Sequence, residues 1–394
     1  KKPALRFKGF TDPWEQRKLG EVFEEYSEKN HAELPPLTII QGGGTIRRDE
    51  SERALQYDKS SLSNYKMVNK DDFIVHLRSF EGGLEKASSQ GIISPAYHTF
   101  HGEDVDSRFY YAYFRSKNFI NKDLKPHVYG IRDGRSIDIE GMKTIRIPWA
   151  SYPEQKSIGD FLAHLDTLIT LHQRKYEKLL NIKKSMLDKM FPQNGASVPE
   201  IRFKGFTDPW EQRKLGDNIA EYTEKTTINN QYPVLTSSRR GIFFQTDYYD
   251  GNQIASADNT GYNIVPYGYF TYRHMSDDEI FHFNINDITE NGIVSTLYPV
   301  FTTDENLDSR YLQYQLNYGK EFAKYAILQK QGGSRTYMYL NKLKELRLTI
   351  PNFVEEQKKI SAYFMKLDNL ITLHQRKLEK LQNIKKSCLE KMFV

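Results

Sequence analysis

The residues of this sequence with the clearest chemistry are arginines set among glycine, serine and tyrosine. They occur in stretches found in both halves of the chain: QGGGTIRR at 41–48, HLRSFEGG at 76–83, YGIRDGR at 129–135, LTSSRRGIFF at 235–244, YRHM at 272–275 and QGGSRTYMY at 331–339. Arginine in a loop can bind a phosphate or both acceptors of a guanine edge, while Gln, Ser and His read other base edges. Because the stretches occupy corresponding places in the two halves, we interpret them as DNA-binding loops. The alternative is solvated turns with incidental charge.

The candidate DNA contacts are the polar and aromatic side chains of these stretches: Arg47, Arg48, Arg78, Tyr129, Arg132, Arg135, Ser237, Ser238, Arg239, Arg240, Tyr272, Arg273, Gln331, Ser334, Arg335 and Tyr337. Overall charge adds little to this interpretation. The net charge is +5, from 56 Lys and Arg against 51 Asp and Glu, a balance found in many soluble proteins. The 26 Tyr and 23 Phe suit recognition surfaces, but half-buried strands use the same residues.

Motifs for catalysis or metal binding are not found. GGG at 42–44 is not a dinucleotide-binding fingerprint, and no P-loop is present. EQK at 154–156 and 356–358 could be half of a nuclease motif, but it lacks an acidic partner on a strand. It falls in the first turn of a predicted helix, where Glu has a capping role. The only cysteine, Cys388, excludes an internal disulfide framework and a cysteine-rich metal site. The sequence therefore predicts a chain that recognises rather than catalyses, with no metal.

The chain is an internal duplication. The leader RFKGFTDPWEQRKLG at 6–20 recurs unchanged at 202–216, and LITLHQRK at 168–175 recurs at 370–377. The middles of the two units, 21–150 and 217–350, have diverged almost completely. If the two copies had only accumulated substitutions at random since the duplication, their sequences would have diverged evenly along their length. The unevenness indicates that leader and tail do one job twice, while the middles do two different jobs.

Each tail carries an a/d heptad pattern over more than four heptads, which predicts two long helices packed on one another in an antiparallel pair. The residues assigned to this helix seam, or to partner binding together with the leader tryptophans, are Leu165, His172, Leu179, Leu367, His374, Leu381, Trp14 and Trp210. The two histidines could be read as a metal site or a catalytic base. No ligand set accompanies them, so we interpret them as a polar core pair that fixes register.

The middles contain short β-branched and aromatic runs separated by Gly, Asn and Asp, which predicts mixed α/β domains. The expected organisation has four consecutive parts: a first domain at 1–150 with leader 6–20, a helix at 151–193, a second domain at 194–352 with leader 202–216, and a helix at 353–394. No stretch of about eighteen apolar residues is present, and the start KKPALRF lacks a signal-peptide core. We therefore expect no membrane association.

This order of leader, divergent domain, EQK and a lysine-rich helix with LITLHQRK and KMF, given twice, resembles the specificity (S, HsdS) subunit of type I restriction-modification systems. The resemblance implies that each middle is a target-recognition domain that reads one half of a bipartite double-stranded DNA target. It implies that the helices set the spacer and dock two modification (methyltransferase) subunits. It also implies a prokaryotic, cytoplasmic chain without a cofactor, with S-adenosylmethionine in the modification subunits and ATP and Mg in the restriction (translocase) subunits.

Two other classes of function stay open at this point. The chain could be a coiled-coil scaffold whose two domains bind protein partners, or an enzyme with an unrecognised active site. Salt-sensitive binding to a two-part duplex would separate the first interpretation from both.

Overall fold

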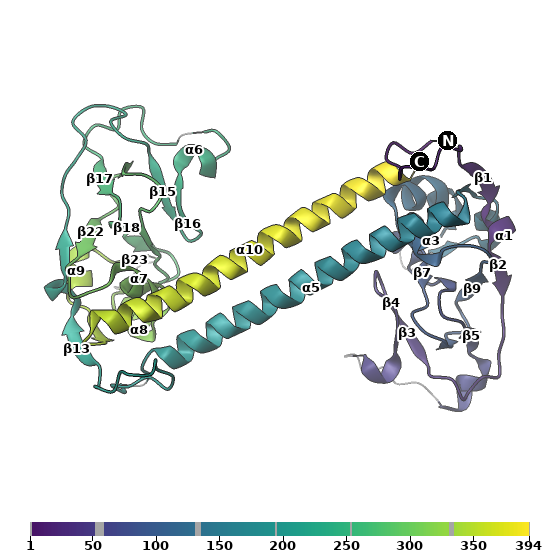
Figure 1. The fold of residues 1–394 in the computed structure, drawn as a ribbon, viewed down its shortest axis with the longest axis horizontal. Coiled ribbons are helices and arrows are strands. Elements are labelled where there is room, and N and C mark those ends of the chain that lie inside the picture. Colours follow the sequence, from purple (N-terminus) through teal and green to yellow (C-terminus); the bar gives the residue numbers. More distant parts are fainter. Residues whose placement is uncertain are drawn as a thin grey trace. The chain divides into compact units, whose positions relative to one another are not determined.

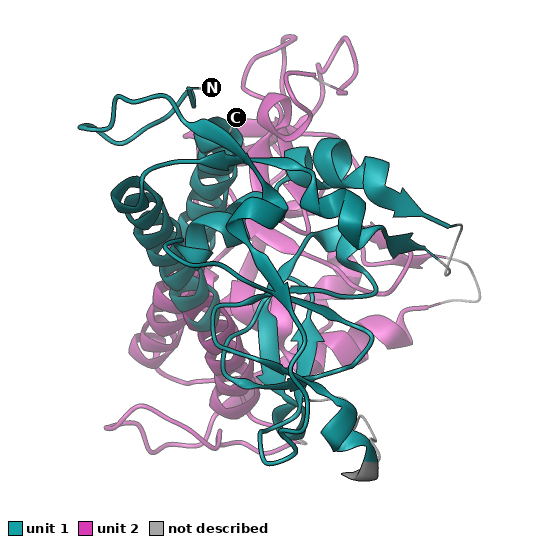
Figure 2. Cartoon of the chain, turned by 90° about the vertical axis from the view of Figure 1, so that its right-hand side faces the viewer, with its two compact units in different colours: residues 1–174, 374–394 teal, residues 175–373 magenta. Residues whose placement is uncertain are grey.

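The structure is a computed structural model that describes residues 2–51, 59–130, 135–193, 195–252, 254–330 and 335–393. It divides into two compact units, residues 1–174 with 374–394 (unit 1) and residues 175–373 (unit 2) (Figure 2). The division passes through both long helices, α5 (Tyr152–Met190) and α10 (Val354–Met392), which have 39 residues each (Figure 1). The predicted mixed α/β domains and packed long helices are confirmed. The units, however, are not consecutive in sequence, because each contains the end of a helix that begins in the other.

Unit 1 is built on a four-stranded sheet in the order β2-β9-β6-β7, with β1 paired to β12 beside it. Its strands and α-helices are β1 (Glu15–Lys18), α1 (Leu19–Val22), β2 (Glu24–Tyr26), β3 (Leu37–Ile40), β4 (Gly44–Arg47), β5 (Lys66–Val68), β6 (Phe73–Val75), α2 (Ser79–Gly82), β7 (Glu85–Lys86), β8 (Gly91–Ile93), β9 (His98–His101), α3 (Ser107–Phe114), β10 (Val128–Tyr129), β11 (Ser136–Ile137), α4 (Ile139–Lys143) and β12 (Arg146–Trp149). Phe73 and Phe100 face each other across β6 and β9 in the centre of its aromatic core.

Unit 2 repeats this plan with a sheet in the order β14-β22-β18-β20 and the pair β13-β24 beside it. Its strands and α-helices are β13 (Glu211–Lys214), β14 (Ile219–Glu221), β15 (Leu235–Ser238), β16 (Gly241–Phe244), α6 (Gln245–Tyr248), β17 (Asn263–Pro266), β18 (Phe270–Tyr272), β19 (Met275–Ser276), β20 (Phe283–Ile285), β21 (Asn291–Val294), β22 (Val300–Thr303), α7 (Ser309–Tyr318), α8 (Lys320–Leu328), β23 (Thr336–Tyr337), α9 (Leu340–Lys344) and β24 (Arg347–Ile350). Phe270 and Phe301 stack at the place of Phe73 and Phe100, with ring centroids 4.6 Å apart. Central strands β6 and β18 are therefore equivalent.

The repeated leader is held against the start of a long helix in each unit. Glu154, buried in the first turn of α5, accepts hydrogen bonds from Arg6 Nε at 2.6 Å and from Trp14 Nε1 at 3.0 Å. In unit 2, Glu356 of α10 accepts from Arg202 Nε at 2.6 Å and from Trp210 Nε1 at 3.3 Å. Helix capping was therefore the wrong role for these glutamates, because their carboxylates bind the leader.

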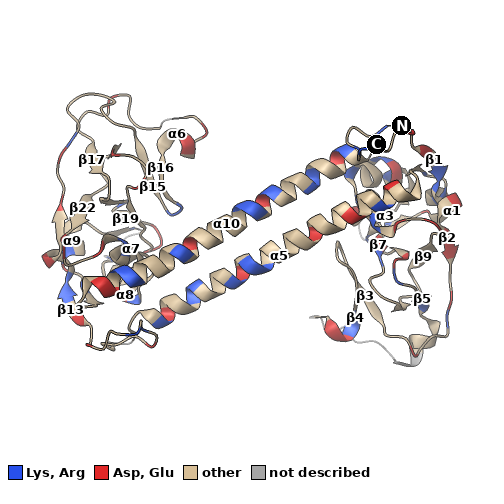
Figure 3. Cartoon of the chain, viewed as in Figure 1, with Lys and Arg blue, Asp and Glu red and all other residues tan. Residues whose placement is uncertain are grey.

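The long helices pack in an antiparallel sense within each unit. In unit 1, Asp166 pairs with Lys385. His172, which comes later in α5, meets His374, which comes earlier in α10. In unit 2, Lys183 pairs with Asp368 at 2.6 Å, and Phe191, which follows α5, stacks on Phe364. Lys, Arg, Asp and Glu are distributed along both helices (Figure 3). Of the predicted seam residues, Leu165 and Leu367 are buried, and Leu179 and Leu381 pack partly buried against the cores.

Candidate nucleic-acid interface

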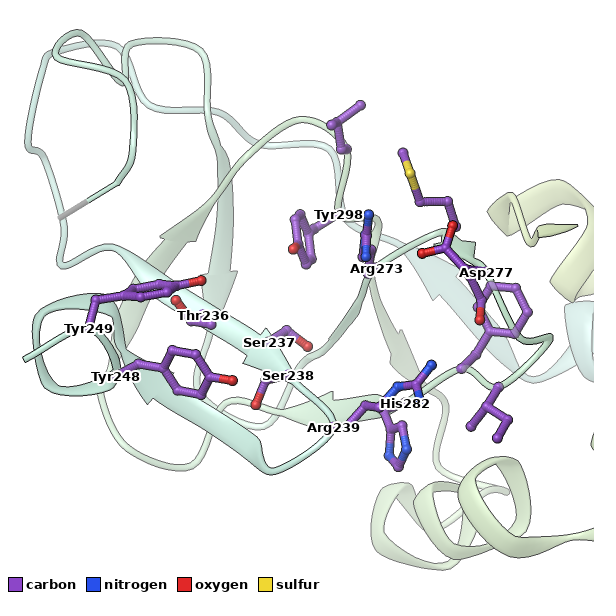
Figure 4. A pocket seen from close by; sticks show the side chains of 15 residues that line it. Thr236, Ser237, Ser238, Arg239, Tyr248, Tyr249, Arg273, Asp277, His282 and Tyr298 are labelled. Carbon is purple, nitrogen blue, oxygen red and sulfur yellow. The ribbon is translucent and has the colours of Figure 1, made fainter. Parts of the chain in front are cut away.

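An open pocket of about 480 Å³ in unit 2 collects several of the predicted contacts (Figure 4). It lies between the β15–β16 hairpin, the end of β18 and the segment that leads into β20, and its lining is Thr236, Ser237, Ser238, Arg239, Tyr248, Tyr249, Arg273, Met275, Ser276, Asp277, Ile280, Phe281, His282, Leu297 and Tyr298. Tyrosine rings, hydroxyls and guanidinium groups in one open concave surface are suited to the edges and faces of nucleotide bases.

The hairpin that carries Arg239 and Arg240 at its turn is fastened to the sheet beneath it. Asn284 of β20 donates from Nδ2 to Ser237 Oγ and to the carbonyl of Ser238, both at 2.9 Å. Ser237 Oγ in turn donates to the carbonyl of Thr271 in β18 at 3.1 Å. Ser237 is buried and therefore positions the hairpin, whereas the partly exposed Ser238 remains at the pocket surface.

The candidate arginines of unit 2 fall into two groups. Arg239 pairs with Asp278, and Arg335 pairs with Asp277 at 2.8 Å. Arg240 lies over the ring of Tyr248 with its guanidinium carbon 5.3 Å from the centroid, and exposed Arg273 lies on the pocket rim. Within the described residues, neither Arg240 nor Arg273 has an acidic partner, so their charges are available to a ligand.

Two titratable groups of the pocket have shifted pKa values. Burial raises the pKa of Tyr298, against a smaller opposing effect of Arg273. Burial also lowers the pKa of His282, and the nearby Arg239 lowers it further. At neutral pH His282 is therefore neutral, and a neutral imidazole can donate one hydrogen bond and accept another.

Tyr272 was wrongly predicted as a DNA contact. It is the last residue of the central strand β18, its ring is fully buried, and its hydroxyl donates to the carbonyl of Met338 at 2.9 Å. All three residues of β18 are buried, so the chain reaches the surface only after the strand ends, at Arg273. Tyr298, which the sequence did not single out, lines the pocket instead.

The hairpin β3–β4 of unit 1 corresponds to β15–β16 of unit 2, but Arg47 and Arg48 do not lie at its turn as Arg239 and Arg240 do. Arg47 is the last residue of β4 and is paired with Leu37, at the end of the hairpin opposite its turn. Its guanidinium group forms an ion pair with the nearby Asp49 at 2.8 Å. Arg48 donates from Nε to the carbonyl of Leu37 at 3.3 Å and lies over Tyr65. Its role is at least partly structural. The equivalent of the Arg239–Arg240 turn is the loop of glycines after Ile40.

That glycine loop is held by residues that no local sequence pattern identifies. Buried Glu85 accepts hydrogen bonds from Gly42 N at 2.7 Å, from Gly44 N at 3.1 Å and from Tyr111 Oη at 2.7 Å, and it pairs with Arg115. Gly44 has φ +75°, and a Cβ there would lie 2.7 Å from a backbone oxygen. The loop is thus a fixed turn. Only a long-range contact reveals this, since Glu85 is distant in sequence.

The remaining candidates of unit 1 that the structure describes are exposed. Arg78 precedes α2, Tyr129 is in β10, and Arg135 lies over the ring of Phe80 at 5.7 Å from its centroid. In unit 2, Tyr337 is partly exposed and stacks on Tyr339 with centroids 5.9 Å apart. The predicted contacts Arg132, Gln331 and Ser334 lie outside the residues that the structure describes.

Among the residues assigned to partner binding or the helix seam, Trp14 and Trp210 are buried in the unit cores, so their side chains are structural. The Nδ1 atoms of His172 and His374 lie 2.8 Å apart, so one ring donates a hydrogen bond to the other. Over the described ranges, no cluster of three or more His, Cys, Asp or Glu side chains could hold a metal ion. Within the same ranges, no helix has the length and apolarity needed to cross a bilayer.

Comparison with known proteins shows which family this chain matches. Residues 11–181 and 207–383 each match the family described as type I restriction modification DNA specificity domain. Two proteins of Methanocaldococcus jannaschii are 22% identical to the chain. One is named as the specificity subunit of type I restriction enzyme MjaX, with 96% of this chain and 92% of that protein covered. The other is the type I restriction enzyme MjaVIII specificity subunit, with 82% and 78% covered.

The crystal structure of the S subunit of the type I restriction-modification system of M. genitalium has the same fold. Its TM-score is 0.60 at 13% identity, over 100% of this chain and 99% of the other. The two matched ranges show that the chain carries two DNA specificity domains, one for each copy of the internal repeat. The chain belongs to the type I restriction-modification DNA specificity family. It is the non-catalytic specificity subunit of such a system.

Proposed function

We propose that each unit reads one half of a bipartite duplex DNA target with the loops that surround its sheet. The observation that carries this proposal is that one scaffold bears different recognition side chains at equivalent places. Directly after the central strand, unit 2 has Arg273 where unit 1 has His76. At the hairpin turn, unit 2 has Arg239 and Arg240 where unit 1 has a glycine loop. Such a pair of surfaces would recognise two different base sequences.

The long helices would set the spacer between the two half-sites and dock two modification subunits. The repeated LITLHQRK segment supports this, because its second leucine is exposed in both units, 44% for Leu171 and 45% for Leu373. An apolar side chain that is equally exposed in both copies of a repeat is suited to contact two copies of one partner. The tryptophans of the leader do not serve this purpose, since they are buried.

In this assembly the modification subunits would bind S-adenosylmethionine, and the restriction subunits would bind ATP and Mg. The specificity chain would hold these subunits on the DNA without a cofactor of its own. The rival scaffold function would also use the exposed leucines, but it gives no role to the arginine and tyrosine pocket of unit 2.

The test is to map methylated sites in DNA exposed to the chain together with its modification subunits. A two-part sequence with a constant gap is expected. The purified chain should also bind duplex DNA with an affinity that falls as salt rises, because bound Lys and Arg release counterions from the phosphates. A chain that assembles with partners but shows no salt-dependent duplex binding would instead support the protein-binding scaffold.

A further inference from the structure

Three consecutive acidic residues of unit 2 pair with three basic residues from separate segments. Asp278 pairs with Arg239 of the hairpin turn, Asp277 pairs with Arg335 before β23, and Glu279 pairs with Lys330 after α8. Two of these cations, Arg239 and Arg335, are candidate DNA contacts. Residues 277–279, here named the acidic loop, therefore neutralise part of the surface that would face DNA.

The acidic loop has a defined shape. Asp278 Oδ1 accepts hydrogen bonds from Ser276 Oγ at 2.8 Å and from Ile280 N at 3.3 Å, which closes the loop on itself. Asp277 lines the pocket that also contains Arg273 and Arg239 (Figure 4). Hydrogen bonds from Arg239 and Ser276 hold the pKa of Asp278 well below its usual range. This carboxylate is thus charged throughout the neutral range.

Unit 1 has an arginine at the place of Arg335, but it has an aromatic residue at the place of Asp277. The fifth residue after the central strand is Asp277 in unit 2 and Phe80 in unit 1. Arg335 directly precedes β23 and binds Asp277, whereas Arg135 directly precedes β11 and lies over the Phe80 ring. An aromatic ring orients a guanidinium group and leaves its charge uncompensated. The duplication thus provides an internal comparison of Arg335, which is paired with an acid, and Arg135, which has no acidic partner within the described residues.

We propose that the acidic loop is a selectivity element for DNA. Its carboxylates occupy Arg239 and Arg335 in the free protein, so the phosphates of an arbitrary duplex must displace them before these arginines can bind. The Arg239–Asp278 and Arg335–Asp277 pairs are both exposed, and exposed ion pairs are weak enough to exchange. A duplex whose base edges also bond to the pocket would compensate for the exchange, and a random duplex would not. This inference rests on the proposed DNA-reading function.

The direct test uses the full-length chain and a random-sequence duplex, with binding followed by fluorescence anisotropy at several salt concentrations. The variant is D277N/D278N, which keeps the size of both side chains and one acceptor oxygen in each, and removes their negative charge. The control is Glu345→Gln, which removes an exposed carboxylate paired with Lys214, a residue outside the candidate surface. At about 100 mM salt we expect the double variant to bind random duplex roughly three- to tenfold more tightly, with a salt slope steeper by about 1–2. The control should bind like the wild type.

The reciprocal test transfers the acid to unit 1. Phe80→Asp should give Arg135 a carboxylate partner and weaken binding to the random duplex, whereas Phe80→Leu should not. Because Phe80 is partly buried, circular dichroism of both variants must match the wild type before binding is compared. If either fails this comparison, D277N/D278N decides alone.

The outcomes distinguish a failure of the proposed selectivity element from a failure of the proposed DNA-reading function. If wild-type chain binds duplex with a steep salt dependence but D277N/D278N binds random duplex no more tightly, the selectivity element is wrong and the proposed function stands. If the wild-type chain shows no salt-dependent duplex binding, both are wrong.

Discussion

Trp210 donates the N–H of its indole to the carboxylate of Glu356 at 3.3 Å, in a buried site where Arg202 also binds the same carboxylate. The equivalent bond joins Trp14 to Glu154 at 3.0 Å in unit 1. Strand pairing adds to each contact, because the leader strands β1 and β13 pair with β12 and β24, the strands that precede the long helices. Leader and tail are therefore repeated together for a structural reason: each fixes the other.

The first prediction tests this contact in unit 2. Glu356→Gln leaves the nearly buried Arg202 without its counter-charge, and breaking a buried pair in this way should cost about 3–5 kcal/mol. The matched control is Glu355→Gln, which changes an exposed carboxylate at the adjacent position. Denaturant unfolding followed by tryptophan fluorescence should show an earlier transition for E356Q alone. Equal transitions for the two variants would mean that the carboxylate contributes little.

The second prediction concerns the arginines of the pocket. Arg273→Ala removes a cation that has no acidic partner in the described part of the chain, so binding to the specific site should weaken by about 1–3 kcal/mol if it reads a base. Arg239→Ala should cost less, because the wild type must first break the pair with Asp278. Competition assays with specific and random duplex measure both. If R273A weakens all duplexes alike, this residue binds phosphate rather than a base.

The sequence predicts the helical frame far better than it predicts the interface. A heptad pattern repeats many times, so it locates α5 and α10 within a few residues. Strands of three or four residues contain too few positions for alternation to show which side is buried, and for this reason Tyr272 was misassigned. The pairing of Arg239 with Asp278 depends on how the hairpin folds over the sheet. No local pattern encodes it.

The third prediction concerns the histidine pair of the helix seam in unit 1. Because His172 and His374 share one hydrogen bond, His172→Leu or His374→Leu alone leaves a polar ring without this partner and should cost about 1–2 kcal/mol. The double leucine variant should lose less than the sum of the two, with a coupling of about 0.5–1.5 kcal/mol. Thermal unfolding of the four proteins gives the cycle. Strictly additive losses would show that the two rings do not interact energetically.

The fourth prediction concerns partner docking. Leu171→Asp or Leu373→Asp places a charge in each proposed contact and should weaken docking of one modification subunit by at least about 1–2 kcal/mol. Each single variant should then retain one copy of the partner, and the double variant none. Mass measurement of the assembled complex gives this stoichiometry. The control is Leu180→Asp, which changes a similarly exposed leucine of α5 outside the repeated segment (39% exposed). If L180D also loses the partner, the docking site is not confined to the repeated segment.

The last prediction is that specificity is modular. Exchanging the divergent middle of unit 2 for that of another specificity subunit should change one half-site only, because the base-contacting loops of unit 1 are untouched. The exchanged segment should begin at 217 and end before Arg347, so that the native β13–β24 ladder and the Trp210–Glu356 bond are retained. The gap between half-sites should also persist, since α5 and α10 are unchanged. Methylation mapping of the hybrid, assembled with the original modification subunits, gives both quantities. A hybrid that alters both half-sites or the gap would show that the two recognition surfaces are coupled through the helices.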